Sequence, residues 1–183
     1  MKYLLFIALL AIAGCGSKET TQQTTTDDAA ALGGGQSTVQ DDESQRNIVQ
    51  VASASDDHST LVAALKGAEY VDVLANAGPF TVFAPTNDAF NKLPAGTVDD
   101  LLKPENKDKL RNILEYHVYV GVINESLIQD GMTLNQVNLD NVTIKKNGDN
   151  LVVNDANVLA TIKTSNGIIY SIDAVLLPPD KSN

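Results

Sequence analysis

The chain of 183 residues contains a single cysteine, two histidines and no tryptophan. The lone Cys15 excludes an intramolecular disulfide, so the stability of the folded part must come from core packing. His58 and His117 have no histidine or cysteine neighbour at metal-ligand spacing, and no zinc or copper site is predicted. Walker-type loops, dinucleotide-binding glycine motifs and Gly-x-Ser-x-Gly motifs do not occur. We therefore expect no cofactor, no metal and no catalytic residues.

Basic residues are also scarce. The formal net charge is −10 at pH 7. Residues 16–45 carry one lysine against six acidic residues, and residues 46–183 carry eleven basic against seventeen acidic residues. A nucleic-acid-binding protein needs a basic face that neutralises phosphates. Nucleic acid is therefore excluded as a partner.

The N-terminus has the pattern of an export signal. Lys2 precedes an apolar run from Tyr3 to Ala13, which is too short to span a bilayer. The segment Ile12-Ala13-Gly14-Cys15 resembles the lipobox of bacterial lipoproteins, which implies a signal peptide over 1–14 and a membrane anchor on acylated Cys15. Gly16 in place of the aspartate that retains many lipoproteins in the inner membrane favours the outer membrane. The alternative is an ordinary signal peptide that happens to contain a cysteine.

Residues 15–45 are interpreted as the lipidated cysteine and a disordered acidic tether. Thr, Gln, Asp, Ser and a run of three glycines dominate the segment, which therefore cannot bury enough apolar surface to offset its ordering entropy. A flexible chain of this length has a typical reach of about 30 Å. Residues 180–183 are expected to form a short tail.

The remaining residues, 46–179, read as one domain in which helices come first and strands later. Apolar residues recur at helical spacing around 48–52, 61–65 and 71–75, and short helices are expected near 87–93, 97–102 and 105–115. From residue 142 the pattern alternates with a period of two, and strands are expected around 142–145, 151–153, 161–163 and 168–177. Helices followed by strands predict an α+β fold.

The most informative segment runs from Gly78 to Phe90. Residues 80–83 are all aromatic or β-branched, which predicts a strand that stops before Pro85. Thr86 is a good helix N-cap, and Asp88 falls in the first turn of the helix that follows.

This strand-to-helix segment resembles the first signature of the fasciclin domain family. Residues 110–118, with the pair Tyr116-His117, resemble its central segment, and residues 166–178 resemble its closing strand. The resemblance implies a β-sandwich wedge flanked by several short helices over residues 46–179, with a strand that starts at Tyr116. The spacing of Leu110, Ile113, Leu114 and His117 alone would continue the helix through His117, whereas the β-branched Val118 and Val120 agree with the strand. The resemblance also implies signature or partner-binding positions, which are Thr81, Phe83, Asp88, Tyr116, His117 and Tyr170.

Two of these positions have competing interpretations. His117 is either part of an adhesion contact or a buried imidazole bonded to a neighbouring carbonyl or to the Asp88 region, and burial is favoured. Tyr170 is either an interface residue or a tyrosine half-covered by the neighbouring strand, and the second reading is favoured. Integrin-binding animal members are thought to use an Asp-Ile pair, at positions occupied here by Thr161 and Ile162. The missing carboxylate argues against a metal-bridged contact of that kind.

The resulting functional hypothesis is a lipid-anchored adhesion or interaction module of the bacterial cell envelope, which binds a protein or polysaccharide partner without catalysis. One alternative is a glycan-specific module, which would need exposed aromatic platforms from Tyr70, Tyr116, Tyr119 and Tyr170. Another is an envelope polymer hydrolase, which would need a Ser or Thr beside His117.

Overall fold

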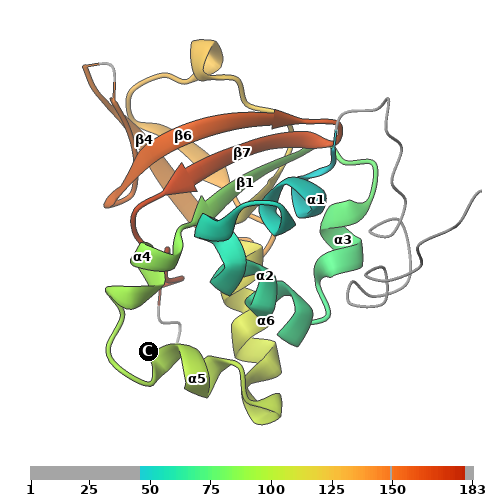
Figure 1. Ribbon diagram of the computed structural model, residues 1–183. Coiled ribbons are helices and arrows are strands. Elements are labelled where there is room, and N and C mark those ends of the chain that lie inside the picture. Colours follow the sequence, from blue (N-terminus) through green and yellow to red (C-terminus); the bar gives the residue numbers. More distant parts are fainter. Residues whose placement is uncertain (1–45, 149, 180–183) are drawn as a thin grey trace, which may run out of the picture.

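The computed structural model describes residues 46–148 and 150–179 (Figure 1). The predictions of a signal peptide over 1–14, an acylated Cys15, a tether to residue 45 and a tail from residue 180 concern residues outside these ranges. Within the described part, helices cover one side of a mixed β-sheet, and most of them precede the strands in the chain. The α+β class is confirmed.

The helices are short, and in two of them the side chain of the N-cap residue satisfies a backbone amide of the first turn. The side chain of Asn47 accepts a hydrogen bond from the backbone N–H of Gln50, whose own side chain bonds back to the amide of Asn47. Thr86 accepts from the backbone N–H of Ala89, so the predicted cap is confirmed. The α-helices are α1 (Ile48–Ser53), α2 (Ser59–Gly67), α3 (Val71–Ala75), α4 (Asn87–Asn91), α5 (Thr97–Leu101) and α6 (Lys107–Tyr116). Three 3-10 turns accompany them: η3 (Asp56–His58), η4 (Pro104–Asn106) and η5 (Glu125–Leu127).

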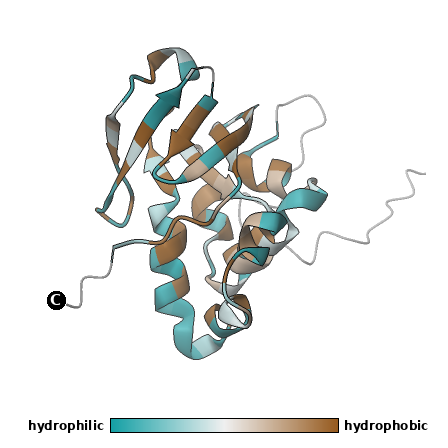
Figure 2. Cartoon of the chain, turned by 90° about the vertical axis from the view of Figure 1, so that its left-hand side faces the viewer, coloured by the Kyte–Doolittle hydropathy of each residue, from teal (hydrophilic) through white to brown (hydrophobic). Residues whose placement is uncertain are grey.

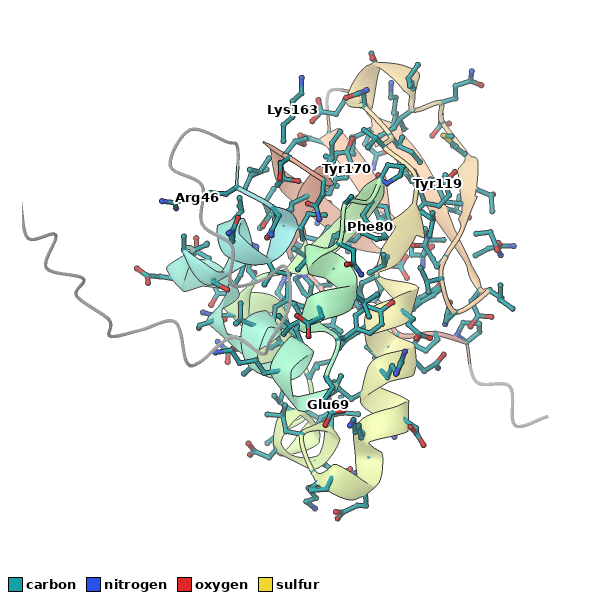
Figure 3. All side chains as sticks on the ribbon, turned by 90° about the vertical axis from the view of Figure 1, so that its right-hand side faces the viewer. Arg46, Glu69, Phe80, Tyr119, Lys163 and Tyr170 are labelled. Carbon is teal, nitrogen blue, oxygen red and sulfur yellow. The ribbon has the colours of Figure 1, made fainter. Side chains whose placement is uncertain are left out.

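The sheet places the first and last strands of the chain side by side. The strands are β1 (Phe80–Pro85), β2 (Val118–Val120), β3 (Met132–Asn135), β4 (Asn141–Asn147), β5 (Asn150–Val153), β6 (Ala156–Thr164) and β7 (Gly167–Ile172). Their order is β2-β1-β7-β6-β5-β4-β3. The β1–β7 pair is parallel and the other pairs are antiparallel. Phe80 of β1 and Tyr170 of β7 mark this central pair in Figure 3.

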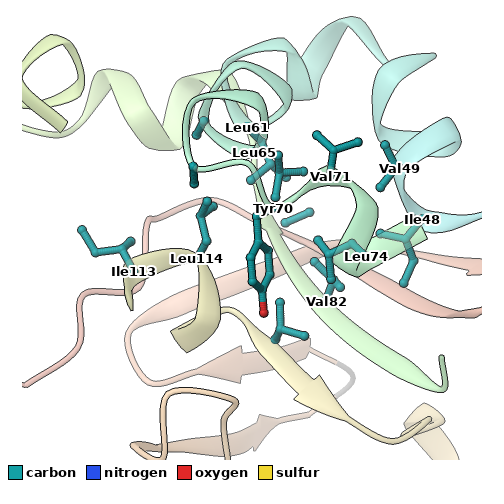
Figure 4. Packing of buried hydrophobic residues seen from close by; sticks show 14 of the residues in the cluster. Ile48, Val49, Leu61, Leu65, Tyr70, Val71, Leu74, Val82, Ile113 and Leu114 are labelled. Atoms are coloured by element: carbon teal, nitrogen blue, oxygen red, sulfur yellow. The ribbon is translucent and has the colours of Figure 1, made fainter. Parts of the chain in front are cut away.

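Strands β1 and β7 are buried on both faces, because two apolar clusters sandwich them. Val82, Ala84 and Ile169 face the helices and pack with residues of α1, α2, α3 and α6 (Figure 4). Phe83 and Tyr170 face the other way, toward side chains from β3, β4 and β5. The sheet therefore curls around the cluster that contains Phe83 and Tyr170, and this gives the sandwich-like wedge that the family resemblance implied. In Figure 2 the strands carry many hydrophobic residues, and the helices alternate between hydrophobic and hydrophilic residues along the ribbon.

Gly167 permits the close approach of β7 to β1. A Cβ atom at this position would lie 2.0 Å from the carbonyl oxygen of Phe80. Any larger residue must push the two central strands apart, so the glycine of the Asn166-Gly167 motif is required by packing.

Several boundaries differ from the sequence-based expectation: β3 (Met132–Asn135) was not expected, and β6 begins at Ala156, five residues before the expected strand. Helix α6 continues through Tyr116, and His117 caps it in a helical conformation, so the expected strand start at Tyr116 is wrong and β2 begins at Val118. The helical spacing of apolar side chains prevailed over β-branched propensity there. Strand β1 extends to Pro85, which occupies its last position, and β7 ends at Ile172 rather than near Leu177.

Candidate interaction surface

Thr81 is a buried bridge between β1 and the segment that follows β2. Its hydroxyl donates to the carbonyl oxygen of Gly121 at 2.7 Å and accepts from the backbone N–H of Ile123 at 3.1 Å. The side chain has no measurable solvent exposure. Thr81 therefore fixes the course of the chain beyond β2 and has no free hydrogen-bonding group for a partner.

Phe83 and Tyr170 form a stacked pair inside the sheet, with ring centroids 5.9 Å apart and an interplanar angle of 26°. The Tyr170 hydroxyl donates to the carbonyl oxygen of Ile123 at 2.7 Å. Burial raises the pKa of Tyr170 to about 12. Tyr170 is 1% exposed, which disfavours the interpretation as an interface residue, and it is covered more completely than the half-covered alternative supposed.

The Tyr116-His117 pair is also internal. The Tyr116 hydroxyl donates to the carbonyl oxygen of Asn141 at 2.9 Å and accepts from the side-chain amide of Asn154 at 3.1 Å. His117 Nδ1 lies 2.8 Å from the carbonyl oxygen of Ile113, and Nε2 lies 3.0 Å from the backbone nitrogen of Leu176. These partners define a neutral ring in which Nδ1–H donates and Nε2 accepts, and burial lowers the pKa of His117 to about 4.

Five of the signature residues are buried and therefore do not form part of a preformed contact surface. Their solvent exposure does not exceed 3%. The favoured interpretation of His117 as a buried imidazole bonded to a carbonyl is confirmed, and the alternative adhesion contact through Tyr116 and His117 is wrong. The five residues are Thr81, Phe83, Tyr116, His117 and Tyr170.

The three other sequence-derived positions reach the surface. Asp88 is exposed in the first turn of α4. Thr161 is exposed on β6, and its hydroxyl donates to the carboxylate of Glu125 in η5. Ile162, the next residue, is partly buried and packs on the helix-side cluster. Sequence reasoning noted a missing carboxylate at position 161 and overlooked Glu125, which lies 36 residues earlier and reaches the same spot.

A groove lies at the end of the sheet where β7 begins, and it includes Asn124, the residue before Glu125. It has a volume of about 350 Å³ and is open to solvent. Its wall includes the apolar side chains of Pro79, Val122 and Ile168 and the exposed Lys163, which projects outward in Figure 3. We call it the β7 groove; it is lined by Ala77, Pro79, Val122, Asn124, Lys163, Thr164, Ser165, Asn166, Gly167 and Ile168.

Asn166 holds the floor of the β7 groove in place. Its side-chain amide donates to the carbonyl oxygens of Leu74 and Asn76, both at 2.7 Å. Its side-chain oxygen accepts from the backbone N–H of Ile48 at 2.9 Å. One buried side chain thus joins α1, α3 and the β6–β7 turn, so the groove is preformed.

His58 is the one imidazole of the described chain with a serine hydroxyl in reach. Its Nδ1 lies 2.9 Å from the Ser55 hydroxyl and its Nε2 lies 3.1 Å from the Ser171 hydroxyl. The ring is 5% exposed, and desolvation lowers its pKa despite the opposing effect of Asp57. Neither described groove nor cavity is lined by His58. Both ring nitrogens are occupied in a closed contact that joins η3 to β7.

Metal-ligating side chains do not gather anywhere in residues 46–148 and 150–179: no three His, Cys, Asp or Glu residues there are placed to share an ion. An enclosed cavity of about 10 Å³ lies against His117 and is lined almost entirely by apolar side chains. It has room for about one water molecule. No helix in the described ranges has the length and apolar character needed to cross a membrane.

Comparison with known proteins identifies the family. The fasciclin domain model matches residues 56–178. The chain belongs to the fasciclin domain family, as the three sequence segments implied. A two-domain structure from the insect cell adhesion molecule fasciclin I superposes with a TM-score of 0.65 at 19% identity, and the match covers 72% of this chain and 51% of that one. That likeness establishes the fold.

The bacterial relatives are closer in sequence. Protein sll1483 of Synechocystis is 51% identical over 133 residues, which cover 72% of this chain and 73% of the relative. The cell surface glycolipoprotein MPB83 of Mycobacterium bovis is 44% identical over 140 residues, 70% of this chain and 60% of the relative. The immunogenic protein MPB70 of the same organism is 40% identical over 139 residues, 72% and 69% of the two chains.

Proposed function

We propose that the chain is a lipid-anchored adhesion or interaction module of the bacterial cell envelope, which binds a protein or polysaccharide partner without turnover. The observation that carries this proposal is the division of the described domain into a closed interior and a preformed outer surface. The five buried signature side chains pack or bond internally, whereas the β7 groove presents apolar and polar groups together. Such a combination is typical of binding surfaces.

Its location at a cell surface is supported by a relative and by the N-terminal sequence. MPB83 carries the name cell surface glycolipoprotein. The lipobox-like segment ending in Cys15 gives this chain a route to the same kind of attachment. Two or three acyl chains would hold the protein on a membrane almost irreversibly. Many anchored copies on one surface would then turn weak single-site binding into strong overall attachment.

Binding without chemistry agrees with the state of the two histidines. Both ring nitrogens of His117 are bonded to backbone groups, and no Ser or Thr hydroxyl within residues 46–148 and 150–179 is hydrogen-bonded to the ring. His58 does contact two serines, but neither the β7 groove nor the enclosed cavity reaches its ring. A hydrolase would need a nucleophile and base open to a substrate.

The glycan-specific alternative is weakened by the placement of the tyrosines. Tyr70, Tyr116 and Tyr170 are buried, and only Tyr119 among the described tyrosines is partly exposed. A sugar-binding platform built from the tyrosines named above therefore has one candidate residue, Tyr119. A protein partner, or a polysaccharide bound through hydrogen bonds in the groove, fits the described surface better.

The anchor is tested by mass spectrometry of the protein isolated from its own membranes. We expect an N-terminal peptide that begins at Cys15 with attached acyl chains. The Cys15→Ser variant should appear in the soluble fraction. An unmodified thiol on a released wild-type protein would overturn the anchoring part of the proposal and leave the binding part open.

Binding is tested with Cys15→Ser protein, so that no acyl chain contributes, and with isolated envelopes of the source cells. We expect saturable retention that Val122→Asp reduces, because a carboxylate would enter the apolar wall of the β7 groove. Leu177→Asp is the matched control, since Leu177 is also exposed but does not line the groove. Equal losses with both variants, or no saturable retention of the wild type, would contradict the proposed surface.

A further inference from the structure

The chain enters the described domain beside the β7 groove. The carbonyl oxygen of Arg46, the first described residue, accepts from the backbone N–H of Ser165 at 3.1 Å. Ser165 lines the groove, and two residues after Arg46 the amide of Ile48 is bonded to the side chain of Asn166 in the groove floor. The residues that precede Arg46 therefore leave the domain at the edge of the groove.

The rim of the groove carries positive charge. Lys163 lines the groove, Arg46 stands where the chain enters, and both side chains are exposed and point away from the domain in Figure 3. Neither takes part in an ion pair within residues 46–148 and 150–179. Glu125, which follows the groove residue Asn124, is engaged by the hydroxyl of Thr161. Two cations at one groove, in a chain with a net charge of −10, favour an anionic occupant.

The sequence just ahead of Arg46 has the complementary charge. Asp41-Asp42-Glu43 places three carboxylates in a row, and residues 19–45 contain no lysine or arginine. An extended chain spans about 3.6 Å per residue, so all three carboxylates lie within about 18 Å of Arg46 along the chain. This distance allows them to reach Lys163, which is two residues from Ser165. Val39, which precedes the carboxylates, supplies an aliphatic group for the apolar wall of the groove.

Connectivity selects this segment over an unlinked anion. A group joined to its site by a short chain has an effective concentration of about a millimolar or more, without any need for tight binding. Exposed ion pairs are individually weak. The segment therefore occupies the groove for part of the time and leaves it accessible to a partner for the rest.

We propose that residues 39–45 bind back into the β7 groove and compete there with the envelope partner. The inference rests on the proposed function, because it concerns the regulation of the same surface. The carboxylates of residues 41–43 pair with Lys163 and Arg46, and Val39 packs on the apolar wall. A partner has to displace the segment, so the apparent affinity falls in proportion to the fraction of molecules whose groove is free.

The test compares two matched variants of the full chain, both carrying Cys15→Ser. The near variant neutralises the proposed segment with Asp41→Asn, Asp42→Asn and Glu43→Gln. The far variant removes three charges at a distance from the domain, with Glu19→Gln, Asp27→Asn and Asp28→Asn. Both variants have the same net charge, so a difference between them reports where the carboxylates lie in the chain.

The first readout needs no partner. Gln40→Cys is the only thiol once Cys15 is serine, so it accepts a nitroxide label at one site. We expect the label to broaden the amide resonances of Val122 and Ile168 in the groove wall. The broadening should be several-fold weaker in the near variant and unchanged in the far variant.

A charge swap distinguishes a specific contact from general attraction. Lys163→Glu should weaken the broadening as the near variant does, and adding Asp41→Lys and Asp42→Lys to it should restore the broadening. The difference between the unsubstituted segment and the near variant should disappear at about 1 M salt, where charges are screened within about 3 Å.

The second readout is retention on isolated envelopes. The near variant should bind about two- to five-fold more tightly than the chain with an unsubstituted segment, because its groove is free for a larger fraction of the time. The far variant should bind like the unsubstituted chain.

Several outcomes would overturn the inference. They are equal broadening in the near variant and the unsubstituted chain, equal envelope retention by the near and far variants, and broadening that grows with protein concentration, which would place the segment of a second copy in the groove. Saturable retention together with any of these leaves the proposed function standing. Label-dependent broadening without any envelope retention removes the proposed function and leaves the intramolecular contact, so the two failures are distinguishable.

Discussion

The buried signature residues of this domain have their polar groups paired, whereas its outer loops leave apolar groups exposed to solvent. Inside, each polar signature side chain is matched to a backbone partner, as in the Tyr170 hydroxyl on Ile123 and the His117 ring between Ile113 and Leu176. Outside, Leu139 and the wall of the β7 groove leave apolar groups open to solvent. The buried residues of the motifs that reveal the family therefore report how the domain is held together.

The largest effect expected from breaking the interior is that of Gly167→Ala. The added Cβ would lie 2.0 Å from the Phe80 carbonyl oxygen, between the two central strands. We expect a loss of about 3 kcal/mol or more in the free energy of unfolding, measured by urea denaturation. Gly131→Asn is the control, since Gly131 has open space around it and asparagine tolerates its positive φ. Equal stability of the two variants would show that the strands separate freely.

Acid should destabilise the interior through His117. Its pKa is lowered from 6.5 to about 4 in the folded state. The unfolded chain therefore binds a proton between these pH values that the folded chain excludes. Stability is retained above pH 6.5 and falls as the pH drops toward 4, by about 3 kcal/mol. Urea midpoints across this range should fall less steeply for His117→Gln than for the wild type, and parallel curves would contradict the assignment.

Removal of one interior hydroxyl should have a smaller effect. Tyr170→Phe keeps the ring stacked on Phe83 but leaves the carbonyl oxygen of Ile123 without its donor. We expect a loss of about 1–2 kcal/mol in stability and no change in envelope retention. Reduced retention at unchanged stability would place Tyr170 in a binding surface after all.

The smallest effect on stability should come from the outer surface. Glu125→Gln weakens the exposed contact with the Thr161 hydroxyl. A change within about 0.5 kcal/mol is expected, because surface contacts of this kind contribute little. Envelope retention measured in parallel shows whether the surface formed by Glu125 and Thr161 takes part in binding. A stability loss above 1 kcal/mol would mean that η5 holds β6 in place.

The local chemistry of the sequence predicted much of the fold. Thr86 caps α4 as its position indicated, and the apolar spacing of residues 110–117 gives α6. At Tyr116 the apolar spacing predicted helix and the family resemblance predicted a strand. The structure follows the spacing, because α6 includes Tyr116. Propensity thus located the elements well and their ends less well.

The candidate surface was far less readable. The contact of Glu125 with Thr161 joins residues that only the folded chain brings together. The β7 groove depends on Asn166 bonding to α1 and α3, which pattern reasoning within one segment does not reveal.

The attachment of Arg46 to the sheet has a mechanical consequence. The carbonyl oxygen of Arg46 accepts from the backbone N–H of Ser165, and two residues later Ile48 is bonded to Asn166. A pull on the chain ahead of Arg46 is therefore transmitted straight to the β6–β7 turn, next to the innermost strand pair. The peripheral helices α4 and α5 therefore do not carry this load. It reaches first the β6–β7 turn and the fully buried strand β7.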